Sequence, residues 1–153
     1  MKLNLSGEGN YSEAVTEVPV ISRAVDTTAN DSDKSFVVPD GEMWHLNSIY
    51  VVLVTDATVG NRQMVFEVLN TASVVVGRIS AGATQAASLT RRYLCMQGTF
   101  RETAFINTDI QVPIPQDSFL PAGFTLHVYD SAAISPAGDD MTVSASVKKY
   151  KGA

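Results

Sequence analysis

The sequence predicts an all-β protein: a single jelly-roll-like β-sandwich of about eight antiparallel strands, preceded by an extended N-terminal arm. Three observations lead to this fold class. Apolar and polar residues alternate with a period of two along several segments, as in strands with one buried face. Turn-forming residues recur roughly every ten positions, and no segment keeps a helical period over several turns. We expect an arm over residues 1–33 and a sandwich domain over residues 34–153.

The segment over residues 36–55, FVVPDGEMWHLNSIYVVLVT, predicts the long strand around which the sandwich is built. Period-two counting places its side chains on two opposite faces: Trp44, Leu46, Tyr50, Val52 and Val54 on one, and His45, Asn47, Ile49, Val51 and Leu53 on the other. The second half is apolar on both faces, so a covering loop or another subunit is needed on one side. We expect Val51 and Leu53 to lie at such an interface.

Further strands are expected along the rest of the chain. Met64, Phe66 and Val68 share one face of a strand over residues 62–69, and residues 74–76 follow across a short hairpin loop. Alternation predicts three more strands, over residues 86–96, 106–114 and 141–150. Residues 98–107 show no clear pattern.

Two proline–glycine corners precede similar segments. Pro39-Asp40-Gly41 and Pro121-Ala122-Gly123 are each followed by an alternating run, with a histidine six residues after the proline, His45 or His127. Such an internal repeat is expected of a sandwich built from two corresponding halves. The core should be anchored by five residues on the inward faces: Trp44, Leu46, Phe66, Leu126 and Val128.

The N-terminal arm has little core of its own. Pro19 allows only an edge strand or an extended segment around it, because proline cannot donate to a sheet ladder. The apolar residues Val18, Val20 and Ile21 are candidate interface residues. Two placements stay open: the arm lies along its own sandwich, or it reaches a neighbouring subunit.

Composition and charge exclude several classes of protein. The 153 residues are 45% hydrophobic and contain one cysteine, which rules out an internal disulfide. Residues 1–42 hold eight acidic and three basic side chains, and the remaining residues are neutral in sum. An acidic N-terminal segment followed by a region without net charge argues against direct nucleic-acid binding. No signal-peptide core and no run of ~18 apolar residues is present, so we expect no membrane segment.

No constellation in the sequence predicts catalysis, a cofactor or a metal. His45 and His127 should point outward, and neither has a second ligand two residues away. Cys95 has no local base and is expected to be buried. Two acidic pairs, Asp139-Asp140 and the pair formed by Asp31 and Asp33, do not follow the spacing of a calcium loop.

Three segments resemble small virion structural proteins of tailed bacteriophages: FVVPDGEMWHLNSIYVVLV, TVGNRQMVF and LPAGFTLHVYDSAAISPAGDD, at residues 36–54, 58–66 and 120–140. The resemblance implies a jelly-roll sandwich without catalytic activity, located on the virion and made in the host cytoplasm. Such proteins decorate and cement the capsid shell, often as trimers, or occur in the neck and tail. The implied partners are further copies of the chain and the major capsid protein or other virion proteins.

The function expected from these observations is capsid decoration as a homo-oligomer. Two alternatives remain open. One is a neck, tail or receptor-binding component. The other is a carbohydrate-binding sandwich, for which Tyr11, Tyr129 and Tyr150 are the candidate exposed aromatics.

Overall fold

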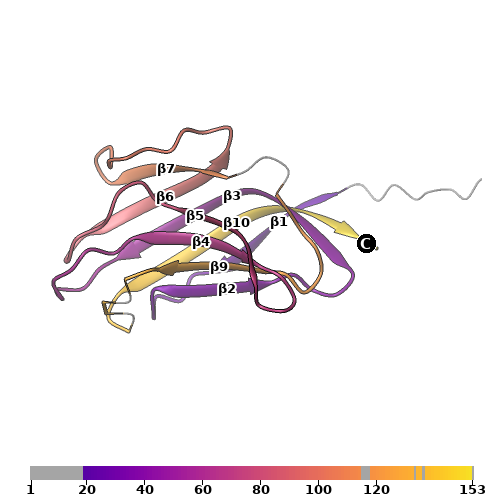
Figure 1. Cartoon of the computed structure of the whole chain (residues 1–153), viewed down its shortest axis with the longest axis horizontal. Helices are drawn as coiled ribbons and strands as arrows, with labels where there is room; N and C mark the ends of the chain where they lie inside the picture. Colours follow the sequence, from indigo (N-terminus) through magenta and orange to yellow (C-terminus); the bar gives the residue numbers. More distant parts are fainter. Residues whose placement is uncertain (1–18, 115–117, 133, 136, 153) are drawn as a thin grey trace, which may run out of the picture.

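Two β-sheets pack face to face and form the whole of the described protein (Figure 1). The computed structural model describes residues 19–114, 118–132, 134–135 and 137–152. These residues contain ten strands: β1 (Val20–Asp26), β2 (Asp33–Val37), β3 (Glu42–Val54), β4 (Met64–Leu69), β5 (Val75–Ser80), β6 (Thr90–Gln97), β7 (Asp109–Ile114), β8 (Phe119–Leu120), β9 (Thr125–Asp130) and β10 (Asp140–Lys151). The predicted all-β sandwich is confirmed.

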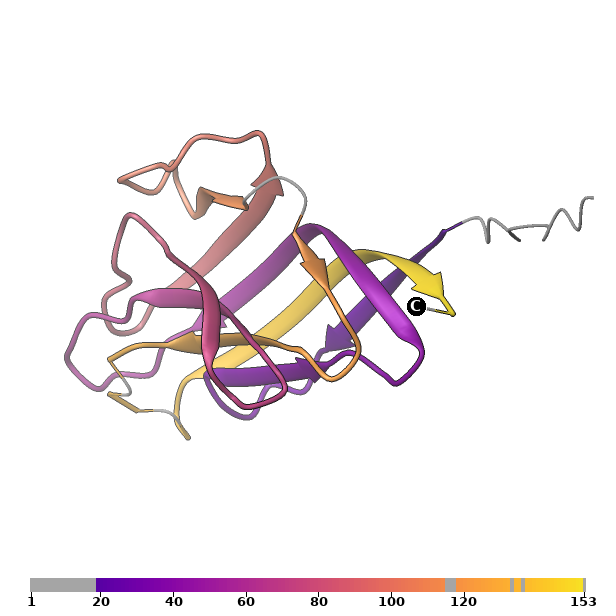
Figure 2. The same cartoon turned by 45° about the vertical axis from the view of Figure 1, so that its right-hand side comes forward.

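The strand order separates a larger from a smaller sheet. The six-stranded sheet runs β1-β10-β3-β6-β7, with β8 also paired to β3, and the four-stranded sheet runs β2-β9-β4-β5. Figure 2 shows the same two layers from a view turned by 45° relative to Figure 1. All neighbouring strands are antiparallel except β6 and β7, which are parallel. The expectation of antiparallel strands throughout is wrong for this pair. Residues 98–108 form a crossover that returns the chain to the end of the sheet at which β6 begins, so that β7 runs in the same direction as β6.

Residues 20–26, within the segment expected as an arm, form an edge strand of the sandwich. All seven residues of β1 pair with β10. Of the candidate interface residues in this segment, Val20 and Ile21 lie on this strand and are exposed, whereas Val18 lies outside the described residues.

The two proline–glycine corners adopt the same turn and lie beside each other. Gly41 and Gly123 have φ angles of 72° and 77°, a backbone conformation that glycine adopts without a steric penalty. Phe124 N–H donates to Pro121 O, as Glu42 N–H donates to Pro39 O. Two further backbone hydrogen bonds, between Val38 and residues 123–124, tie the corners together. The strands that follow, β3 and β9, belong to opposite sheets and face one core.

One hydrophobic core fills the space between the sheets. The five expected anchor residues are all buried: Trp44, Leu46, Phe66, Leu126 and Val128. They share a single cluster with inward residues of β6, β7 and β10. An apolar cavity of about 100 Å³, lined in part by Leu46, Phe66 and Leu126, remains within this layer.

A β-bulge in β3 reverses which residues face the core. Ser48 pairs with Ser146 and Leu46 pairs with Val147, so that Asn47 is an extra residue without a partner in β10. Beyond the bulge Ile49, Val51 and Leu53 point inward and are fully buried. The expectation that Val51 and Leu53 form an interface is therefore wrong, since strict period-two counting fails across a bulge.

Candidate interaction surface

The two histidines lie on different sheets and do not come together. His45 packs against Phe119, with ring centroids 4.6 Å apart and ring planes tilted by 30°, and its Nε2 is 3.2 Å from Gln97 Nε2. His127 lies between two carboxylates, with Nε2 2.7 Å from Asp33 Oδ1 and Nδ1 3.7 Å from Glu67 Oε2. Because the carboxylates approach opposite nitrogens of the ring, they do not converge on a point where a metal could bind.

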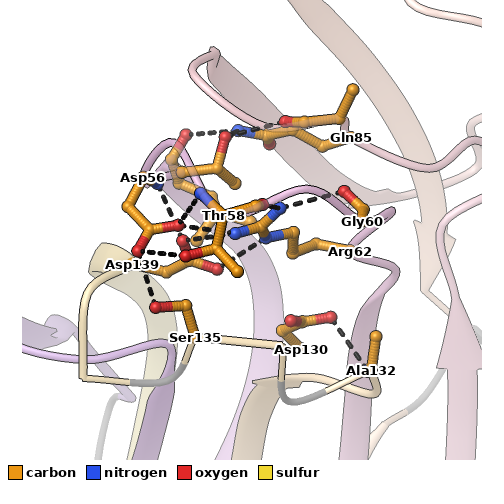
Figure 3. A network of polar contacts seen from close by, with 12 residues as sticks. Asp56, Thr58, Gly60, Arg62, Gln85, Asp130, Ala132, Ser135 and Asp139 are labelled. Carbon is orange, nitrogen blue, oxygen red and sulfur yellow. Dashed lines mark hydrogen bonds and ion pairs between the residues drawn. The ribbon is translucent and has the colours of Figure 1, made fainter.

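A buried arginine organises the loops at one end of the sandwich (Figure 3). The guanidinium of Arg62 is fully buried and forms a bidentate ion pair with Asp139, with Nε–Oδ2 and Nη2–Oδ1 distances of 2.8 and 3.0 Å. Nη2 also donates to Asp56 Oδ1, and Nη1 donates to the carbonyls of Thr58 and Gly60. All five guanidinium N–H groups thus have acceptors. Asp139, a member of one of the two acidic pairs in the sequence, thus neutralises Arg62.

The loop that contains the other acidic pair, Asp31 and Asp33, also surrounds a cation supplied by the chain. Lys34 is buried, and its Nζ donates to Thr28 O at 2.9 Å and to Asn30 Oδ1 at 2.5 Å. The carboxylates of Asp26 and Asp31 lie 3.6 Å from the same Nζ. Within the described ranges no group of three His, Cys, Asp or Glu side chains is arranged to hold a metal ion.

Hydrogen bonding in the Arg62 network lowers the pKa of Asp56. The largest cause is the hydrogen bond from Ser135 Oγ, at 2.6 Å, followed by the backbone N–H of Thr58. A lowered pKa in the folded state stabilises the protein above the ordinary aspartate pKa, and this contribution is lost as pH falls through the lowered value.

Ser135→Ala should therefore reduce stability more at pH 7 than at pH 3. We expect the difference in unfolding free energy between Ser135→Ala and wild type to shrink on acidification, as measured by urea unfolding at both pH values. Ser35→Ala, at an exposed position on β2, serves as the control and should show no such change. If Ser135→Ala loses the same unfolding free energy at both pH values, the hydrogen bond from Ser135 is not what lowers the pKa of Asp56.

Cys95 is a core residue and not a nucleophile. Its side chain is fully buried in β6, and burial raises the pKa of the thiol. Because only the thiolate reacts rapidly, native protein should resist a thiol reagent such as DTNB, and one equivalent should react after unfolding in urea. Rapid stoichiometric labelling of the native protein would show that the thiol is accessible.

The tyrosines considered for carbohydrate binding do not form a platform. The hydroxyl of Tyr129 donates to Glu67 at 2.7 Å, and its ring stacks on His127. Tyr150 is on the other sheet, with its ring 6.2 Å from Phe119, and Tyr11 lies outside the described residues.

The outer face of the six-stranded sheet is the main candidate for an interaction surface. We define it by the side chains that point away from the core along β1, β10, β3 and β6. The strand register aligns them in rows: Val25, Ser144, Tyr50 and Leu94; Arg23, Ser146, Ser48 and Met96; and Thr142, Val52 and Arg92. The four-stranded sheet covers only the opposite face (Figures 1 and 2).

This outer face exposes apolar side chains, and its middle row, formed by Val25, Ser144, Tyr50 and Leu94, contains no charged group. Ile21 is 70% exposed, Val25 55%, and Tyr50 and Val54 are each 41% exposed. A groove of about 300 Å³, lined in part by Tyr50, Leu94 and Ile106, opens on the same side. The bulge therefore moves the expected interface on β3 by one residue, from Val51 and Leu53 to Tyr50, Val52 and Val54.

No family model matches the chain, and no curated protein matches it. Among solved structures, the chain is similar to one described as infectious bursal disease virus, Gx strain, at 13% identity over 87% of this chain, with a TM-score of 0.35. A mutant VP2 protein of infectious bursal disease virus, from derived T=1 particles, is similar at 11% identity over 88% of this chain, with a TM-score of 0.30. The chain spans 33% and 40% of the lengths of these two neighbours.

The part of the chain that the structure describes contains no helix long and apolar enough to cross a membrane.

Proposed function

We propose that this chain is a non-enzymatic structural protein of a tailed-bacteriophage virion, and specifically a capsid decoration or cement protein. The observation that carries the proposal is the uncovered outer face of the six-stranded sheet. An exposed apolar surface with a charge-free centre is typical of a protein–protein interface. The charged groups that could have served chemistry, Arg62, Asp139 and Lys34, are instead paired within the chain.

The resemblance to phage structural proteins supports the same proposal through the fold. Its distinctive residues fall at positions that shape the sandwich: the corner at Gly41, the corner at Gly123, and Arg62 with its partner Asp139. These residues determine how the loops and sheets are held.

The proposed mechanism is stabilisation by mass action. A protein that binds only the assembled shell makes disassembly less favourable by its own binding free energy, which is about 2.7 kcal/mol per site at a concentration of 100 times Kd. The chain would act as a homo-oligomer on the major capsid protein or other virion proteins.

Imaging the tagged protein on purified particles tests the proposal. Many evenly distributed copies on the shell are the expected result, together with a lower disassembly temperature for particles that lack the protein. Labelling of a single vertex would instead assign the chain to the neck or tail, including a receptor-binding component. Absence from purified particles would reject a virion role altogether.

A further inference from the structure

We propose that the outer face of the six-stranded sheet binds the same face of a second copy, with the two sheets stacked and their strands antiparallel. This inference builds on the proposed structural role of the face, but it concerns the free protein and is tested without virus particles. Failure to self-associate and failure to decorate a shell are therefore separate results.

The charges on the face are divided between its two ends. Lys148 points outward at the end where β10 finishes, and Arg23 lies on the same half, beside Ser146. Asp140 points outward at the end where β10 begins, and Arg92 lies on that half, beside Val52. Among the described residues, none of Lys148, Arg23 and Asp140 forms an ion pair; the closest charged pair on the face is Arg92 with Asp109, at 4.0 Å. The face is thus basic at one end and has an unpaired carboxylate at the other.

This arrangement is self-complementary under a half-turn. Asp140 and Lys148 are equally far from Ser144 along β10 and lie on the same face. A two-fold axis between the sheets, perpendicular to the strands at Ser144, places Lys148 of each copy over Asp140 of the other. Both ion pairs form at once, because a two-fold interface repeats every contact. Stacked sheets lie ~10 Å apart, a distance that a lysine and an aspartate side chain bridge together.

The centre of the face suits close sheet packing. The outward residues of β10 are small, Thr142, Ser144 and Ser146, so that two sheets can approach along this strand. Larger apolar side chains lie on β3, which is next to β10, and on β6 beyond it: Tyr50 and Val52, and Leu94 and Met96. Four strands, over the nine residues from Asp140 to Lys148, give a footprint of roughly 19 by 30 Å. Such an area lies near the lower limit of stable interfaces, which bury ~600 Å² or more per partner.

The test is a charge exchange measured by light scattering on the full chain. The wild type should have an even multiple of the 16.4 kDa chain mass at micromolar concentration. Lys148→Glu and Asp140→Lys should each raise the dissociation constant about tenfold or more and halve the mass, because each places two like-charged contacts in the pair. Lys151→Glu makes the same charge change at an exposed position outside the face and should leave the mass unchanged.

Mixing the two variants gives the decisive result. A Lys148→Glu chain paired with an Asp140→Lys chain has opposite charges at both contacts, so the mixture should recover the wild-type mass. The double variant Lys148→Glu/Asp140→Lys should recover it by itself. Circular dichroism confirms that each variant is folded. A wild type that is monomeric or trimeric, single variants of unchanged mass, or a mixture that stays dissociated would each overturn the proposal.

Discussion

Replacing Arg62 with methionine should lower the free energy of unfolding by about 3–5 kcal/mol. The substitution leaves the carboxylate of Asp139 fully buried without its cation and removes the donors to the carbonyls of Thr58 and Gly60. An uncompensated charge in the interior costs far more than the loss of an exposed ion pair. Chemical unfolding followed by circular dichroism measures the change.

Two further variants separate the buried charge from the loss of side-chain volume. Arg62→Met combined with Asp139→Leu should be more stable than Arg62→Met alone, because the second substitution removes the unpaired carboxylate. Arg101→Met, at an exposed position, should change the unfolding free energy by less than about 0.5 kcal/mol. Equal losses for Arg62→Met and Arg101→Met would show that the network contributes no stability.

Replacing Trp44 with alanine should also lower the free energy of unfolding by about 3–5 kcal/mol. Trp44 is only 4% exposed and belongs to the core cluster, and its backbone is paired with Leu120 of β8 and Lys149 of β10. Its Nε1 donates to Glu42 Oε2 at 2.7 Å, and Lys149 Nζ lies 5.2 Å from the centre of the ring. Truncation removes these contacts and leaves a cavity that the two sheets cannot close.

The matched control is Phe100→Ala, since Phe100 is an aromatic residue with 87% exposure. It should have an unfolding free energy within about 0.5 kcal/mol of the wild type. Trp44 is the only tryptophan, so unfolding of its variant must be followed by circular dichroism and not by fluorescence. Normal stability of Trp44→Ala with a loss of oligomer mass would move Trp44 from the core to an interface.

Alternation predicts this fold well because buried and exposed residues follow the pleat of a strand. The inward positions of β9 and β10 match period-two counting, and Leu126 and Trp44 lie in one core as the repeated corners indicate. The same counting fails in β3 after Asn47, where one extra residue shifts the register. A bulge leaves no reliable mark in a single sequence, so the interface on that strand could not be assigned correctly.

The sequence contains a signal for the two buried cations, Arg62 and Lys34. Arg62 precedes Met64 and Phe66 at a spacing of two, and Lys34 precedes Phe36 in the same way, so period-two counting places both cations on inward faces. A cation in that position requires a buried acceptor. The sequence therefore predicts that each cation has a buried acceptor. It does not identify Asp139 as the acceptor for Arg62, because the two residues are 77 positions apart and meet only in the folded chain.

The parallel pairing of β6 and β7 could not be read from local patterns. Both strands alternate as antiparallel strands do, and the difference lies in the path of residues 98–108. That path is set by tertiary contacts, such as the edge-to-face packing of Phe105 against Tyr93.

The position of β10 constrains how the protein is made. This strand separates β1 from β3 in the sheet, although both of those strands leave the ribosome long before it does. At ~5–20 residues per second, translation from residue 54 to residue 151 takes roughly 5–20 s. During that interval the apolar half of β3 lacks β10, and until β6 has been made it lacks both of its neighbours, while β1 has none. A nascent chain stalled before residue 140 should consequently bind chaperones or aggregate, and should not give a smaller stable sandwich.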